Sequence, residues 1–307
     1  MRYYVAWTHS DPVYQQELPG TSVLVGPPNV SLAWRARDWP ALPAALIVDS
    51  GAYQYRKLGR SPTPAQLLER QLQIVEGLSI PVGICHLDVP VIGTRNLAEL
   101  DRRVAQNLEH ARWLIDHIQE HPLPPNVRPI GVIQGYTVGL VYTVAQVLQD
   151  MGYTSLAIGS LAGLVASSRD ELYRRVEAAL EAAGPNLHAL GVSSTAVLTR
   201  LVSLGIESAD SGTPAHEAWR GGLFYSDPFR RFKVPSPHFR EWRRSYSFAE
   251  ILAEPLPCDC PVCQQDSSRL LQPRGKEFVR LRAIHNCYHL DRELRLISAR
   301  GSGPDPA

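Results

Sequence analysis

The sequence predicts an α/β protein built as a (β/α)8 barrel of the TIM-barrel type, followed by a smaller appended subdomain. Two observations carry this prediction: short apolar runs alternate with helix-period segments over residues 47–210, and eight such runs can be counted from the N-terminus. Alternation of this kind is typical of β/α units and a parallel sheet. Eight parallel strands favour a closed barrel over a doubly wound sheet.

The candidate strands are eight short apolar runs, and between them lie segments with charged residues on one side and Leu, Val or Ala on the other. The runs are YYVAW (3–7), SVLVG (22–26), ALIVDS (45–50), VGICHLDV (82–89), RPIGVIQG (128–135), SLAIGS (155–160), LHALGVSS (187–194) and ESADS (207–211). Helices are expected near 64–77, 96–119, 138–151, 169–183 and 195–204.

The composition of the chain changes after about residue 212, where Pro, Arg and aromatic residues become frequent. We expect a barrel core at 1–212 and a second subdomain at 213–299 that closes onto the barrel and ends in a helix near 276–297. The loose sequence GSGPDPA indicates a flexible tail at 300–307.

Composition excludes several classes of protein. The hydrophobic fraction of 44% and charged fraction of 20% are those of a globular protein, and no run approaches the roughly 18 apolar residues of a membrane span. The opening MRYYVAWTHSDP is too short and polar for a signal peptide, so a cytoplasmic location and no membrane partner are expected. The five cysteines are too few and too uneven for a disulfide framework.

Positive charge concentrates in the C-terminal third of the chain. Residues 211–307 contain 15 Lys and Arg against 11 Asp and Glu, whereas residues 1–210 contain 16 against 19. Within this region Arg230, Arg231 and Arg243 alternate with Phe and Trp residues. Because basic side chains bind phosphates and aromatic rings stack on bases, we expect nucleic-acid contacts here. A solvated, Arg-rich surface loop around a small aromatic cluster is the alternative.

Four of the candidate strands end in a side chain that a buried apolar strand has no reason to carry: Asp49, Asp88, Gln134 and Asp210. A single Asp after a strand is usually a helix cap. Capping poorly explains why polar residues recur at the ends of four strands. Barrel enzymes, by contrast, place their catalytic residues at the carboxyl ends of the strands. These side chains are therefore predicted to converge on one pocket.

Three cysteines, Cys258, Cys260 and Cys263, crowd into six positions, and His285 follows on the expected terminal helix. This Cys3His set matches the four soft or borderline ligands that a structural Zn²⁺ prefers, so a zinc-binding subdomain is predicted. His289 lies one helical turn further and is the rival fourth ligand. A reduced cysteine cluster without metal is the alternative.

The motifs, taken in order, resemble those of the tRNA-guanine transglycosylases. The resemblance rests on DSGAYQ (49–54), LDVP (87–90), GVIQGY (131–136), AIGSL (157–161), LGV (190–192), Asp210, CDCPVC (258–263) and IHN (284–286). It runs from about residue 46 to 290. It implies a double displacement at C1′ of a guanosine, with Asp210 as nucleophile and Asp49 as general acid and base.

The resemblance also implies a base-binding pocket. Asp88 would accept hydrogen bonds from the guanine edge, while Gln134 and the backbone at Gly159 and Ser160 would address O6 and the 7-substituent. Tyr53 would stack on the base. Ser50 and Gly135 complete the matched motifs as expected substrate contacts. The incoming base would be a 7-deazaguanine such as preQ0, and a homodimer or a partner protein is compatible with the family.

The sequence departs from the tRNA enzymes after the expected nucleophile. Those enzymes continue with Leu-Pro-Thr-Arg, whereas Asp210 is followed here by SGTPAHEAWRGG. The pattern SADS (208–211) with Trp219 looks more like the DpdA-like branch of the superfamily, which installs 7-deazaguanines in DNA. DNA is therefore favoured over tRNA as the polymer. The alternatives are a non-catalytic nucleic-acid-binding subunit of such an enzyme and a barrel glycosidase.

Overall fold

The computed structural model describes residues 1–59, 61–192, 194–234, 250–273 and 275–301. The chain divides into two compact units, one formed by Met1–Thr8 with Thr21–Ser211 and the other by His9–Gly20 with Gly212–Ala307. The segment at 9–20, which the sequence pattern groups with the barrel core, thus packs with the C-terminal part of the chain.

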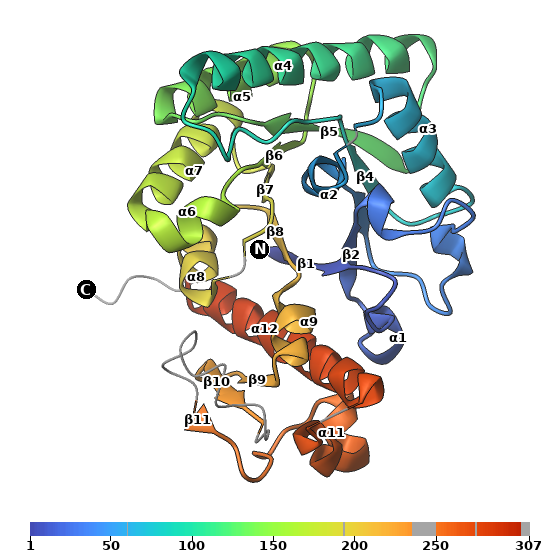
Figure 1. The fold of residues 1–307 in the computed structure, drawn as a ribbon, viewed down its shortest axis with the longest axis vertical. Coiled ribbons are helices and arrows are strands. Elements are labelled where there is room, and N and C mark those ends of the chain that lie inside the picture. The colour runs from blue at the N-terminus through green and yellow to red at the C-terminus, as the bar shows by residue number, and fades with distance from the viewer. Residues whose placement is uncertain (60, 193, 235–249, 274, 302–307) are drawn as a thin grey trace. The chain divides into compact units, whose positions relative to one another are not determined.

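The first unit is a closed barrel of eight parallel strands (Figure 1). Each strand pairs with the next one along the chain, and β1 closes the ring by pairing with β8. The strands are β1 (Arg2–Trp7), β2 (Ser22–Val25), β3 (Leu46–Val48), β4 (Val82–Cys85), β5 (Val127–Ile133), β6 (Leu156–Ile158), β7 (Leu187–Ala189) and β8 (Ser208–Ser211). The predicted (β/α)8 fold class is confirmed.

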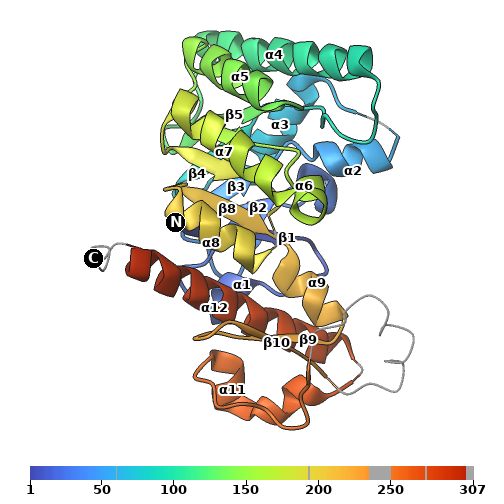
Figure 2. The same cartoon turned by 90° about the vertical axis from the view of Figure 1, so that its left-hand side faces the viewer.

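Helices lie outside the ring of strands, as Figures 1 and 2 show for α3, α4, α5 and α7. The helical elements of this unit are η1 (Pro27–Asn29), η2 (Ala36–Asp38), α2 (Ala52–Lys57), α3 (Pro64–Val75), α4 (Leu97–Glu120), α5 (Val138–Asp150), α6 (Ala162–Ser167), α7 (Arg169–Ala183) and α8 (Thr195–Ser203). All five predicted helices are present, and the short α2 and α6 are additional.

Local sequence explains where the long helices begin. Thr63 caps α3 by accepting from the Gln66 backbone N–H, while the Gln66 side chain accepts from the Thr63 backbone. This reciprocal pair satisfies two N–H groups that a helix start leaves open. Asn96 caps α4 with its side chain alone, accepting from the Glu99 N–H at 3.3 Å. Such caps fix the point at which each loop from the barrel turns into a helix.

Hydrophobic side chains, most of them small or branched, form a buried cluster in the first unit, contributed by the part of the chain that forms β1 to β6. Its members are Tyr4, Leu24, Ala45, Ile47, Cys85, Ile130, Val132 and Ala157. Burying such side chains stabilises the closed ring by roughly 25 cal/mol per Å² of apolar surface. In barrel enzymes the interior is packed in this way, and the catalytic side chains lie at the carboxyl ends of the strands.

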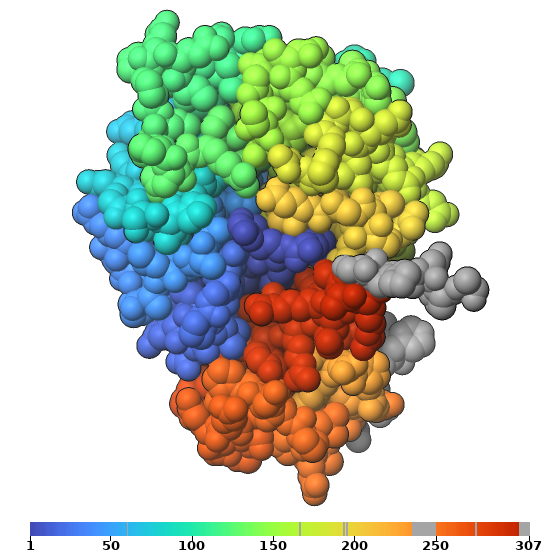
Figure 3. Space-filling model, turned by 180° about the vertical axis from the view of Figure 1, so that it is seen from behind, coloured from blue at the N-terminus to red at the C-terminus, as the bar shows by residue number. Residues whose placement is uncertain are grey.

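The second unit combines a small sheet with one long helix. Its sheet has the order β11-β10-β9 and its elements are α1 (Tyr14–Glu17), α9 (Thr213–Trp219), β9 (Gly222–Tyr225), β10 (Arg230–Lys233), β11 (Glu250–Ile251), α11 (Pro261–Asp266), η3 (Ser267–Leu271) and α12 (Lys276–Gly301). Figure 3 shows the surface of α12, in red, beside the orange surface of α11 and η3.

Buried polar side chains of α12 hold this unit together. Asn286 accepts from the Phe224 N–H and donates to the carbonyls of Pro214 and Gly222. Because these bonds satisfy buried backbone groups of α9 and β9, removing the Asn286 amide would leave several of them unpaired. The predicted terminal helix therefore lies at the centre of the second unit's hydrogen bonds.

No helix among the described residues has the length and apolar character of a membrane span.

Candidate active site and metal centre

The side chains predicted to converge come from the carboxyl ends of neighbouring barrel strands. Asp49 follows β3 directly, Asp88 lies three residues after β4, Gln134 follows β5, and Asp210 is within β8. Since all eight strands are parallel, these ends lie at the same end of the ring. The side chains of Asp88, Gln134 and Asp210 are buried, and that of Asp49 is half-buried.

A continuous hydrogen-bond network surrounds Asp88. The Ser50 hydroxyl donates to Asp88 Oδ1, and the Gln134 amide donates from Nε2 to Oδ2 at 2.6 Å. The Ser160 hydroxyl donates to Gln134 Oε1 at 2.6 Å and accepts from the Val91 N–H at 3.2 Å. The carboxylate and the amide are thus held in one defined orientation before any ligand arrives.

The backbone at Gly159 and Ser160 lies close against this network. A Cβ at Gly159 would lie 2.4 Å from Gln134 Nε2, which only glycine avoids. Ser160 has a φ of +58°, in the left-handed region that a residue with a side chain seldom adopts. This strained backbone places the Ser160 hydroxyl between Gln134 and the loop after β4.

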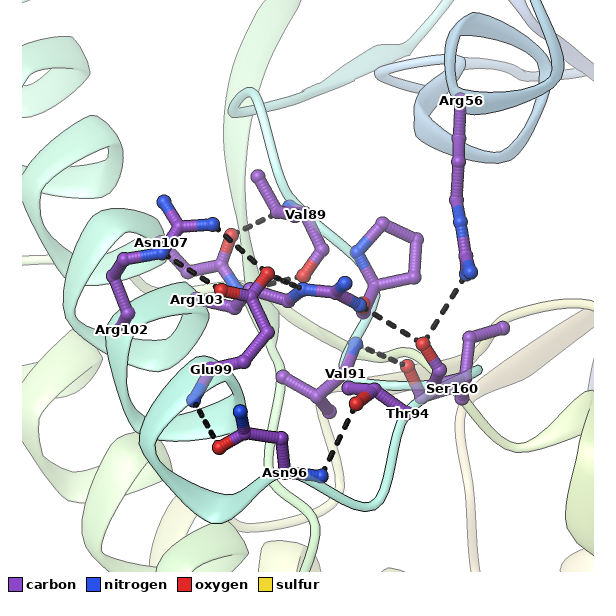
Figure 4. Close-up of polar contacts among 12 residues, drawn as sticks. Arg56, Val89, Val91, Thr94, Asn96, Glu99, Arg102, Arg103, Asn107 and Ser160 are labelled. Atoms are coloured by element: carbon purple, nitrogen blue, oxygen red, sulfur yellow. Dashed lines mark hydrogen bonds and ion pairs between the residues drawn. The ribbon is translucent and has the colours of Figure 1, made fainter. Parts of the chain in front are cut away.

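The loop that follows Asp88 is held by hydrogen bonds from two helices, α4 and α2 (Figure 4). Asn107 of α4 accepts from the Val89 N–H at 2.6 Å and donates to the Val89 carbonyl at 3.0 Å. Arg103 of α4 and Arg56 of α2 both donate to the Ile92 carbonyl, at 2.9 and 3.2 Å. These contacts fix the loop without using the polar atoms of Asp88.

Asp49 has an electrostatic environment suited to proton transfer. Burial raises the pKa of its carboxyl to about 7, and the nearby carboxylates of Asp88 and Asp210 add to the rise. The Gly51 N–H, which donates to Asp49 Oδ2 at 3.2 Å, acts in the opposite direction. Burial also raises the pKa of Asp88. A carboxyl that titrates near neutral pH can both give and take a proton there.

Among the described residues, hydrogen bonds reach the Asp210 side chain at one carboxylate oxygen, Oδ1. Its Oδ1 accepts from the Gly191 N–H at 2.8 Å and lies 3.2 Å from His188 Nε2. His188 is a buried residue of β7 that the sequence prediction does not include among the site residues. The available signal is a polar residue in the middle of the apolar run LHALGV, whereas the prediction considers only polar residues at strand ends.

Two predicted substrate contacts lie outside this network. Tyr53 is on the exposed side of α2, with 54% of its surface accessible and the Lys57 ammonium 4.4 Å from its ring centre. Gly135 is buried, and its carbonyl accepts from the Arg175 guanidinium at 3.1 Å. The Gly135 carbonyl therefore has a partner within the chain, whereas the Tyr53 ring is accessible to a ligand.

The four predicted metal ligands form one cluster in the second unit. The Sγ atoms of Cys258, Cys260 and Cys263 and a ring nitrogen of His285 all lie within 4.8 Å of one another. The His285 Nδ1 lies 3.3 Å from Cys260 Sγ, 3.6 Å from Cys263 Sγ and 3.9 Å from Cys258 Sγ. The cluster joins α12 to the residues that lead into α11.

His289, the rival ligand, is placed differently. Its Nε2 lies 3.1 Å from Cys258 Sγ, and its Nδ1 accepts from the Ser226 N–H at 3.0 Å. It thus approaches one thiol, whereas His285 faces all three. His285 is therefore the histidine that completes a four-ligand group.

The basic residues predicted to bind nucleic acid are only partly described. Arg230 and Arg231 are exposed on β10, where Arg230 pairs with Glu250 at 3.0 Å and Arg231 lies over the Phe224 ring. Arg243 lies outside the described residues. The described part of the segment presents cationic groups next to aromatic rings on the small sheet.

Fold and site together define a barrel protein with interacting carboxyl groups at its strand ends and a separate Cys3His centre. Residues 42–300 match the family model TGT, described as queuine tRNA-ribosyltransferase. The match covers most of the chain, so the protein belongs to this family, as the resemblance predicted. Comparison with curated proteins gives no significant match.

Proposed function

We propose that this protein exchanges guanine for a 7-deazaguanine derivative in a nucleic acid, by double displacement at C1′. Membership of the TGT family supports a guanine transglycosylase, which is a pentosyltransferase, acting on nucleic acid. The single observation that carries the mechanism is that Asp49, Asp88 and Asp210 lie at the same end of the ring of parallel strands, where Asp88 and Asp210 add to the effect of burial in raising the pKa of Asp49. Neighbouring carboxyl groups whose charges raise one another's pKa are typical of active sites that transfer protons.

In the first displacement, a carboxylate oxygen of Asp210 forms a bond to C1′ as the C1′–N9 bond breaks. The electron pair of that bond leaves with the guanine, and Asp49 transfers a proton to the departing base. Because its pKa is about 7, Asp49 is substantially protonated at neutral pH. The product is a covalent ester between Asp210 and the sugar.

In the second displacement, the roles of Asp49 and Asp210 reverse. Asp49, now ionised, takes the proton from N9 of the incoming base as N9 attacks C1′ and releases Asp210. Two inversions restore the original configuration, as in retaining glycosidases. A 7-deazaguanine has no N7 lone pair through which the same acid assistance could expel it, so the exchange runs in one direction.

The network around Asp88 supplies the base pocket in this proposal. A carboxylate has about four acceptor positions, and the bonds from Ser50 and Gln134 use two of them. Asp88 can therefore still accept from the N1–H and exocyclic amine of guanine. Gln134, Gly159 and the Ser160 region would address O6 and the 7-substituent, and Tyr53 would stack on the base.

We further propose that the cysteine cluster binds a structural Zn²⁺. Tetrahedral zinc with bonds of about 2.3 Å to sulfur and 2.0 Å to nitrogen places these atoms roughly 3.5 Å apart, close to the separations of His285 Nδ1 from the thiols. The three sulfur atoms lie within 4.8 Å of one another, and thiolates at that distance repel one another, so a cation between them is needed to hold all three ionised. The metal would link α12 to α11.

DNA is the favoured polymer, because SGTPAHEAWRGG after Asp210 differs from the tRNA-binding Leu-Pro-Thr-Arg of the tRNA enzymes. The direct test incubates the protein with labelled guanine and either duplex DNA or tRNA. We expect label in the DNA. Label in tRNA alone would identify a tRNA enzyme, and no label in either polymer would favour a non-catalytic nucleic-acid-binding subunit.

A further inference from the structure

A buried histidine inside the barrel contacts the proposed nucleophile. His188 is the central residue of β7, and only 4% of its surface is accessible. It pairs in register with Ser208 of β8, and the edge of its ring packs against Tyr4 of β1 with ring centres 5.5 Å apart. The nearby buried cluster is apolar apart from the hydroxyl of Tyr4 and the thiol of Cys85, so an imidazole at this place requires an explanation other than packing.

The hydrogen bonds of His188 define which nitrogen carries a proton. Its Nε2 lies 3.2 Å from Asp210 Oδ1, and its Nδ1 lies 2.9 Å from the Ser208 hydroxyl oxygen. An ionised carboxylate only accepts, so Nε2 must carry the proton. In the neutral ring Nδ1 then accepts from the Ser208 hydroxyl. A chain of donors runs from Ser208 through His188 to Asp210.

These bonds make the two oxygens of Asp210 unequal. Among the described residues, both hydrogen bonds that reach this side chain end on Oδ1, one from Gly191 N–H and one from His188 Nε2. Two donors, one from the side chain of His188 in β7 and one from the backbone just after this strand, fix the carboxylate plane about its side-chain bonds. Oδ2 keeps its lone pairs for another partner.

We propose that His188 is a positioning residue that fixes Asp210 so that Oδ2 attacks C1′. This inference rests on the proposed role of Asp210 as the nucleophile. His188 does not touch the substrate; it holds Oδ1 and so determines the direction of Oδ2. Ser208 acts one step further away, since its hydroxyl can donate to Nδ1 and so hold the ring in the tautomer that donates to Asp210.

Two substitutions of matched polarity isolate this contact. In His188→Gln the amide nitrogen can take the place of Nε2 and donate to Asp210. In His188→Asn the amide is shorter by one methylene, so it reaches the Nδ1 position next to Ser208 and falls short of Asp210. His188→Leu removes both contacts. His86→Leu provides a burial control, because His86 is also buried but neither of its ring nitrogens has a hydrogen-bond partner in the described structure.

The experiment measures kcat and KM for base exchange, the rate of covalent adduct formation on an oligonucleotide, and the Kd of free guanine by calorimetry. Misplacing a reacting group by about 1 Å can cost roughly 10²-fold in rate. We expect His188→Asn and His188→Leu to lose kcat and adduct formation on that order, with the guanine Kd changed less than about threefold. His188→Gln should recover to within about tenfold of the wild type, and His86→Leu should keep the wild-type kcat.

Equal rates for the Gln and Asn variants, or a wild-type kcat in either His188→Asn or His188→Leu, would overturn the positioning role. If His188→Leu does not fold, the Gln and Asn pair still decides the question. Failure of the proposed function itself looks different. In that case the wild type forms no adduct, or Asp210→Asn retains exchange, whatever the His188 variants do.

Discussion

Gln134 donates a hydrogen bond from Nε2 to Oδ2 of Asp88 across 2.6 Å. The other end of the same amide is fixed by the Ser160 hydroxyl, which donates to Oε1. An amide placed between an acceptor and a donor has only one favourable orientation. The NH₂ group of Gln134 therefore faces the proposed base pocket, where it can also donate to a carbonyl such as O6 of guanine.

Replacing Ser160 tests this orientation. Ser160→Ala removes the donor to Gln134 Oε1, so the amide can rotate and present its oxygen to the base. A hydrogen bond of this kind contributes about 1 kcal/mol, so we expect the guanine Kd to rise by about fivefold in calorimetry. Ser160→Gly, which also relieves the φ of +58°, should show the same loss. An unchanged Kd in both variants would show that Ser160 does not control the amide.

The raised pKa of Asp49 predicts a pH dependence. The carboxyl is protonated below its pKa of about 7 and ionised above it. Because the first displacement uses the protonated form, kcat/KM for exchange should fall as pH rises through about 7. Initial rates between about pH 5 and about pH 9 measure this limb. Asp49→Asn should remove both this pH dependence and most of the activity. A kcat/KM that instead increases with pH through this range would contradict the role of Asp49 as the general acid.

The proposed metal centre predicts a difference between His285 and His289. His285→Gln should lose about one equivalent of zinc and destabilise the protein, because His285 Nδ1 faces all three thiols. His289→Gln should retain the metal. Elemental analysis with thermal unfolding measures both variants, and Cys260→Ser should behave like His285→Gln. A wild-type protein without zinc would refute the metal assignment outright.

Charge reversal in the basic segment should weaken nucleic-acid binding in a salt-dependent way. If Arg230 and Arg231 each bind a phosphate, reversing either charge should lower the slope of log K against log salt by about one. The control is Arg102→Glu on α4, whose guanidinium is also exposed and pairs with Glu99. Arg243→Glu, the third substitution in the predicted basic segment, should have the same effect on the slope. Equal slopes in the wild type and the β10 variants would exclude this segment as the phosphate-binding surface.

Much of the barrel was predictable because periodicity is a local property. The runs around Ile47 and Ile130 and the amphipathic stretch of α4 each carry their own signal, and their order then implies the ring. The segment at 9–20 carries no such signal, since its assignment to the second unit depends on contacts with distant residues of α12. The six-residue α2 and α6 are too short to show a helical period.

The candidate site likewise has residues that the sequence indicates and contacts that only the structure shows. The position of Asp49 and Asp88 at strand ends could be predicted because a carboxylate after an apolar strand is unusual in the sequence itself. The contact of His188 with Asp210 could not be predicted in that way, because it depends on the register that places His188 beside Ser208 of the next strand. Likewise, the choice between His285 and His289 needed side-chain directions on one helix, which spacing alone does not give.

The most direct measurement of the central claim is mass spectrometry of the protein after reaction with a guanine-containing oligonucleotide and denaturation. The account predicts a covalent sugar adduct on the peptide that contains Asp210. Asp210→Ala, with an unchanged melting temperature, should show neither adduct nor exchange. An adduct on another residue, or full exchange by Asp210→Ala, would contradict it.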